Sequence, residues 1–216
     1  MDIILNTEEA RVLGCLIEKE MTTPDLYPLT LNSLINACNQ KTNRDPVVAY
    51  DEETVLQAID QLKSKDLIWE SKLSRATKYE ERFTRNNQMV NKEAAVICVL
   101  LLRGHQTIGE IKNRTERIYS FTSLDEVTQT LESTALYDLV EKLPRQPGLK
   151  ESRYRHTMLL DTIDDEKSNT VESENELNCI SVENEKLENL ENKVKKIFNE
   201  LNDLKNSFIE FKKQFE

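Results

Sequence analysis

Apolar residues recur at helical spacing just after a stretch that carries two prolines. Pro24 and Pro28 restrict the backbone and disfavour helix through this segment. The apolar positions that follow, spaced i, i+3, i+4 and i+7, are Leu31, Leu34, Ile35 and Cys38. A polar loop over residues 39–46 leads to a second amphipathic helix near 52–65, whose buried side carries Val55, Ile59 and Leu62. This pattern predicts a helix-turn-helix, the core of a winged helix-turn-helix module.

A helix before this core and a hairpin after it complete the module. The first helix is predicted to begin at Asn6 or Thr7, because both residue types cap helices and an acidic first turn follows. Residues 67–71 and 78–83 are predicted as two strands joined by a turn, which together form the wing. Three helices and a hairpin therefore occupy residues 1–87, which we predict to be the first winged-helix module.

The same order of elements repeats in residues 88–160. The segment EAAV at residue 93 echoes EARV at residue 9, and the apolar positions of the later helices recur in the same order. Two helix starts resemble capping boxes, at Thr107-x-x-Glu110 and at Thr122-x-x-Asp125 or Ser123-x-x-Glu126. Strands near 139–143 and 152–158 form a second hairpin. We therefore expect a second winged-helix module over this range.

The first helix of the second module, residues 91–103, is apolar almost all round. Such a helix is buried on more than one side. We expect it to pack against the first module or against a second subunit. The predicted fold is thus mostly α with small β-hairpins, an α+β fold of two tandem winged helix-turn-helix modules, followed by a C-terminal coiled-coil helix.

The tail of the chain differs in composition from the rest. Residues 161–176 are acidic and polar, which predicts a flexible linker. Residues 177–216 then carry an unbroken seam of apolar a and d positions, which we interpret as the oligomerisation surface. The seam consists of Leu187, Leu190, Val194, Ile197, Leu201, Leu204, Phe208, Phe211 and Phe215. It predicts a coiled-coil homodimer; an amphipathic helix that docks on its own globular part or on a helical partner is the alternative.

Composition bears on the cellular location of the protein and on the state of its cysteines. The 216 residues carry a net charge of −10, and four cysteines occur without a CxxC pair. The chain shows no signal peptide, and its longest apolar run, residues 94–102, is shorter than the roughly 20 residues that cross a bilayer. We therefore expect a cytoplasmic protein without membrane contact, whose cysteines are buried, reduced thiols.

Residues suited to catalysis are scarce. The two histidines, His105 and His156, stand far apart and have no metal-ligand partner at helical spacing. The four glycines are isolated, so no glycine-rich loop can cradle a phosphate. Neither a nucleophile elbow nor an HExxH motif occurs. The sequence therefore predicts a protein that is not an enzyme and that uses no metal or cofactor.

Basic residues gather in the predicted wings and in the loop before the third helix of the first module. A winged helix usually inserts its third helix in the major groove and lays its wing along the backbone. Both third helices begin with acidic residues, which repel phosphates, so we expect contact with the backbone of double-stranded DNA rather than base reading. The candidate contacts are Lys41, Arg44, Lys72, Arg75, Lys78, Lys142, Arg145, Lys150, Arg153 and Arg155. Solvated charges interleaved with glutamates are the alternative interpretation.

Three segments carry a resemblance to a known family. EKEMTTPDLYPLTLNSLINACNQKTNRDPV, GEIKNRTERIYSF and LPRQPGLKESRYRH resemble the YceH family of uncharacterised bacterial proteins, over about residues 1–160. The resemblance implies tandem winged helices and a bacterial cytosolic setting, and it implies no established activity. The basic wings and the loop with Lys41 and Arg44 predict a DNA-associated protein with a regulatory or chromosome-associated role. The alternative is a dimeric adaptor that binds a protein partner and does not bind DNA directly.

Overall fold

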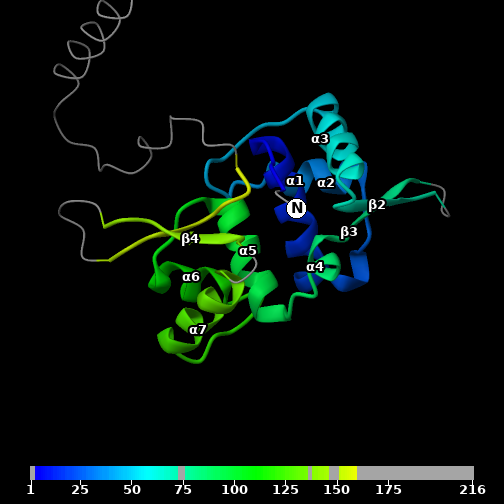
Figure 1. The fold of residues 1–216 in the computed structure, drawn as a ribbon. Coiled ribbons are helices and arrows are strands. Elements are labelled where there is room, and N and C mark those ends of the chain that lie inside the picture. Colours follow the sequence, from blue (N-terminus) through cyan, green and yellow to red (C-terminus); the bar gives the residue numbers. More distant parts are fainter. Residues whose placement is uncertain (1–2, 73–75, 136–137, 146–150, 160–216) are drawn as a thin grey trace, which may run out of the picture. The chain divides into compact units, whose positions relative to one another are not determined.

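The computed structural model describes residues 3–72, 76–135, 138–145 and 151–159, all of which lie in one compact unit, Met1–Asp161. The first half of this unit contains three helices and a small sheet (Figure 1). Its elements are α1 (Thr7–Thr22), the 3₁₀ turn η1 (Pro24–Leu26), β1 (Leu29–Thr30), α2 (Leu31–Cys38), α3 (Glu52–Ser64), β2 (Ile68–Ser71) and β3 (Lys78–Glu81).

The second half repeats this order after the short helix α4 (Phe83–Asn86). Its elements are α5 (Asn91–Arg103), α6 (Ile108–Thr115), α7 (Leu124–Ala135), β4 (Val140–Lys142) and β5 (Tyr154–His156). Strands β4 and β5 pair antiparallel, as β2 and β3 do. The predicted class, an α+β fold with small antiparallel hairpins, is confirmed for the described residues.

Side-chain caps explain why the helices begin where the sequence predicts. At α1, Asn6 Oδ1 accepts a hydrogen bond from the Glu9 amide at 2.7 Å, and the Glu9 carboxylate accepts one from the Asn6 amide at 2.6 Å. At α6, Thr107 and Glu110 exchange the same pair of bonds at 3.2 and 2.8 Å. These capping boxes satisfy backbone donors that have no partner inside the helix.

A short strand that the sequence does not predict has an equivalent in each half. Strand β1 adds to the hairpin in the order β1-β3-β2, with Leu29 opposite Tyr79. In the second half, Gln106 forms the matching antiparallel bridge to Tyr154. Leu29 and Gln106 are 77 positions apart, the same offset that relates the caps Thr30 and Thr107. The two halves therefore share one internal arrangement.

The end of the first hairpin differs from the prediction. The sequence predicted a strand over residues 78–83, but β3 ends at Glu81 and Phe83 begins α4. The Glu81 carboxylate accepts a hydrogen bond from the Thr84 amide at 2.9 Å, so the first turn of α4 is bonded to the last residue of β3. Phe83 is fully buried in this position. Phe83 therefore packs in the core as part of a helix rather than as part of a strand.

Helix α5 is the central element of the compact unit. Its residues 93–102 are all buried, and it packs against α1 of the first half and against α6, α7 and β5 of the second. The predicted packing of this helix on the first module is therefore observed. The two halves also meet where the Leu5 amide donates to the Met158 carbonyl at 2.6 Å.

Gly14 permits the close approach of α1 and α5. A Cβ atom at this position would lie 2.9 Å from Leu102 Cδ2 and 3.1 Å from Leu101 Cβ. We expect Gly14→Ala to lower the free energy of unfolding by about 1–2 kcal/mol, since overpacking outweighs the gain in helix propensity. Urea denaturation measures the change.

The matched control for this substitution is Gly109→Ala in α6. A Cβ atom there meets nothing within 4 Å. Alanine is favoured over glycine in a helix by up to about 1 kcal/mol, so this variant is expected to be slightly more stable than the wild type. A Gly14→Ala protein as stable as Gly109→Ala would show that α1 and α5 are not closely packed at this point.

Candidate nucleic-acid interface

The loop between α2 and α3 is fixed by two arginines that point into the protein. Arg11 donates to the carbonyl oxygen of Pro46 at 2.6 Å, and Arg44 Nε donates to the carbonyl oxygen of Ala37 at 3.1 Å. The Asp45 amide also donates to the Leu102 carbonyl at the end of α5, at 2.9 Å. The loop is therefore part of the framework rather than a mobile arm.

Arg44 is engaged by Glu18 of α1. Its two terminal nitrogens lie 3.2 and 2.6 Å from the Glu18 carboxylate oxygens, and its side chain is 0% exposed. Burial raises the pKa of Glu18, but the hydrogen bonds and charge of Arg44 outweigh it and hold this pKa below its usual range. Arg44 therefore cannot reach a phosphate, and we remove it from the candidate contacts. Lys41 in the same loop is exposed and remains.

The first hairpin presents two of the three predicted cations among the described residues. Lys72 is 77% exposed and lies 3.1 Å from Glu70, while Lys78 is half-buried. Arg75 lies outside the described residues. Trp69 is 52% exposed on β2, and the Arg82 guanidinium stacks over its ring at 4.9 Å. The surface of this hairpin is therefore mixed in charge and partly aromatic.

The second hairpin divides its predicted cations into two kinds. Lys142 and Arg145 are exposed. Arg155 instead lies 2.9 Å from the Glu141 carboxylate, and Arg153 donates to the carbonyl oxygen of His105 at 3.0 Å. These two arginines stabilise the fold locally and are poor candidates for phosphate contact. Lys150 lies outside the described residues, as does the whole predicted seam from Leu187 to Phe215, which stays a prediction.

The third helices of the two halves have acidic first turns, as predicted. In α3 the N-cap Asp51 and both following residues, Glu52 and Glu53, are exposed. In α7 Leu124 is 52% exposed and is followed by the exposed Asp125. A carboxylate in the first turn is stabilised by the helix dipole but repels a phosphate. Tyr79 and Tyr154 are buried strand residues and cannot stack on bases.

No group of three or more metal-ligating side chains occurs within the part of the chain that the structure describes. His156 is buried, and its Nδ1 has no hydrogen-bond partner; burial lowers the pKa of this histidine to about 4. The thiols of Cys15, Cys38 and Cys98 are free and buried, as predicted, while Cys179 lies outside the described residues. None of the described helices is long and apolar enough to cross a membrane.

Comparison with known proteins identifies the family of this chain. Residues 5–149 match the family described as "Protein of unknown function, DUF480". A UPF0502 protein of Solibacter usitatus is 54% identical over 155 residues, which cover 71% of this chain and 75% of the relative. UPF0502 proteins of Geobacter sulfurreducens and Pelobacter propionicus are 43% and 42% identical over 219 residues and are covered completely, as is this chain. The chain therefore belongs to the DUF480/UPF0502 family of uncharacterised bacterial proteins, in agreement with its resemblance to the YceH family.

Proposed function

We propose that the protein is a non-enzymatic tandem winged-helix protein that associates with double-stranded DNA. The repeated order of three helices and a hairpin supports the two modules. A short extended segment before the second helix of each half gives further support. In the first half it is strand β1, in the second half it is Gln106, and both pair with the hairpin of their own half. A winged helix commonly lays its hairpin along the DNA backbone.

The observation that carries the DNA proposal is the exposure of basic residues on both hairpins. Lys72 on the first hairpin and Lys142 and Arg145 on the second are all exposed. Figure 1 shows β2–β3 and β4–β5 on opposite sides of the compact unit. One protomer would then contact backbone at two separate places, and a dimer formed by residues 177–216 would double the number of contacts. The acidic first turns of α3 and α7 favour weak sequence selectivity.

The test is fluorescence anisotropy of a mixed-sequence duplex with the full-length protein, titrated across salt. Each phosphate contact contributes roughly −0.9 to the slope of log affinity against log salt. We expect Lys142→Glu combined with Arg145→Glu to make this slope shallower by about 2 and to lower the affinity at least about tenfold at low salt. Both side chains are exposed, so the fold should be retained.

The matched control is Lys92→Glu combined with Lys112→Glu, which changes the net charge by the same amount at two half-buried positions outside the hairpins. This control should bind DNA much more tightly than the hairpin variant. Equal losses in the two variants would mean that affinity follows net charge alone. An absence of binding by the wild type at low salt would remove DNA association altogether.

A second candidate function, a dimeric adaptor for a protein partner, is favoured by a different observation. The acidic residues at the start of α3 are exposed, and so is Trp69 on β2, and each of these features suits contact with a basic protein better than contact with DNA. Under this proposal, Glu52→Lys combined with Glu53→Lys would abolish partner binding, whereas the hairpin variant would retain it. Failure of the wild type to bind DNA would direct the search to such partners.

A further inference from the structure

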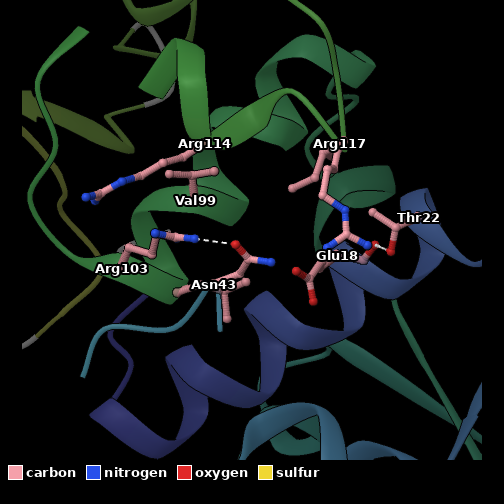
Figure 2. A pocket seen from close by; sticks show the side chains of 9 residues that line it. Glu18, Thr22, Asn43, Val99, Arg103, Arg114 and Arg117 are labelled. Atoms are coloured by element: carbon pink, nitrogen blue, oxygen red, sulfur yellow. Dashed lines mark hydrogen bonds between the residues drawn. The ribbon is translucent and has the colours of Figure 1, made fainter. Parts of the chain in front are cut away.

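A pocket lined by three arginines lies between the two halves of the compact unit (Figure 2). The end of α1, the loop before α3, α5 and the end of α6 all contribute to it. The residues that line it are Glu18, Thr22, Asn43, Val99, Leu102, Arg103, Arg114, Arg117 and Ile118. This pocket includes none of the exposed hairpin cations and plays no part in the proposed DNA contact.

The positive charge of the pocket exceeds the negative charge that faces it. Glu18 is the one carboxylate in the lining, and Arg44 already binds both of its oxygens. Arg114 has Glu110 as a partner, at 3.4 Å. Arg103 donates to the neutral side chain of Asn43, and it forms no ion pair among the residues that the structure describes.

Arg117 has even fewer partners than Arg103. Within the described residues it takes part in no hydrogen bond or ion pair, and it is exposed. Figure 2 shows its guanidinium group turned toward Glu18 and Thr22, on the side of the pocket opposite Arg103. Two guanidinium groups thus face the pocket without a carboxylate of their own.

The environment of Arg103 reflects the same excess of positive charge. Its pKa is lowered by burial first, and then by the positive charges of Arg114 and Arg44. Asp45 and Glu18 act in the opposite direction but do not reverse the shift. An anion in the pocket would offset this repulsion, since buried or half-buried charges are normally paired.

The positions of the two arginines are set by well-fixed backbone. Arg103 ends α5, and the Asp45 amide bonds to the neighbouring Leu102 carbonyl. Arg117 lies in a turn in which the amides of Ile118 and Tyr119 both donate to the Thr115 carbonyl, at 2.7 and 2.8 Å. Little conformational freedom of the backbone would therefore be lost on binding, which favours affinity.

We propose that this pocket binds a small phosphate-bearing molecule, with Arg103 and Arg117 holding the phosphate from opposite sides. Guanidinium groups form paired, charge-assisted hydrogen bonds with tetrahedral oxyanions. Thr22 and Asn43 add neutral polar groups to the lining. Because residues from both halves line the pocket, a bound phosphate would hold the two halves together.

The experiment uses the full-length protein with inorganic phosphate as the probe, against chloride at equal ionic strength. Isothermal titration calorimetry measures binding, and the melting temperature is recorded in parallel. At 100 times the dissociation constant we expect a rise in melting temperature of roughly 5 °C. Arg117→Gln is expected to weaken phosphate binding at least about tenfold, and Arg103→Gln to do the same.

The matched control is Arg85→Gln, which changes an exposed arginine of α4 that lies outside the pocket and is no candidate DNA contact, and it should leave phosphate binding unaltered. Arg117 is exposed and makes no bond within the described residues, so its loss should not unfold the protein. Equal phosphate binding by Arg117→Gln and the wild type would overturn the proposal, as would binding that chloride reproduces. If Arg117→Gln lowers DNA affinity as much as phosphate affinity, the pocket is part of a DNA surface, and the small-molecule assignment is wrong. Loss of phosphate binding with DNA affinity retained would support it.

Discussion

Replacing Arg44 by methionine is expected to destabilise the protein by about 3–5 kcal/mol, because it leaves the buried Glu18 carboxylate without its closest cationic partner, with only the more distant Lys19 at 3.5 Å. Glu18 is 7% exposed, and Arg44 supplies both of its close cationic hydrogen bonds. The substitution also leaves the Ala37 and Asn43 carbonyl oxygens without the donors that Arg44 provides. Urea denaturation at neutral pH measures the loss.

Two further variants separate the causes of this effect. Lys41→Met removes an exposed cation from the same loop and should change the free energy of unfolding by no more than about 0.5 kcal/mol. The double variant Glu18→Met, Arg44→Met should recover a large part of the loss, since replacing both members of a buried ion pair is often nearly neutral. A single Arg44→Met variant as stable as Lys41→Met would mean that Arg44 is not buried against Glu18.

The pH dependence of stability is expected to contain two large and opposite contributions. Burial lowers the pKa of His156 to about 4, from an ordinary value of 6.5. The unfolded chain therefore binds a proton below pH 6.5 that the folded protein rejects until about pH 4, so this contribution falls as the pH falls. Burial likewise raises the pKa of Glu81 to about 7, from 4.5. That contribution is largest below pH 4.5 and is lost as the pH rises through 7.

Single substitutions should reveal how each of these two groups changes the free energy of unfolding with pH. His156→Leu removes a contribution that rises with pH, so the stability of this variant relative to the wild type should fall by about 2 kcal/mol between pH 4.5 and 6.5. Glu81→Gln removes a contribution that falls as the pH rises, so the stability of this variant relative to the wild type should rise by about 2 kcal/mol over the same range. Thermal or urea unfolding in matched buffers gives both slopes. Slopes of the same sign in the two variants would contradict the burial of one of these groups.

Local signals in the sequence were sufficient to predict most helices, and long-range contacts account for what was missed. Capping residues and helical spacing are properties of neighbouring positions, so α1, α5 and α6 begin as predicted. Strand β1 has two residues and exists through its pairing with β3, which the local pattern does not reveal.

The candidate site depends even more on long-range contacts that local sequence patterns do not reveal. Arg44 looks like a solvated loop cation in the sequence, and its burial depends on Glu18, 26 positions earlier. Arg103 ends a largely apolar helix, where a basic residue ordinarily complements the helix dipole, so its sequence position does not indicate a binding site. Its juxtaposition with Arg117 depends on how α5 and α6 pack against each other. The local hint was an arginine at the end of a helix that is otherwise almost entirely apolar.

The packing of α5 on α1 also bears on how the chain is made. Buried faces of α1 are covered by a helix that begins at residue 91. While the chain leaves the ribosome, α1 emerges early and keeps an apolar face in contact with water until α5 has been synthesised. The first half is thus an incomplete folding unit, and during that interval its exposed face is a surface for chaperones or for aggregation.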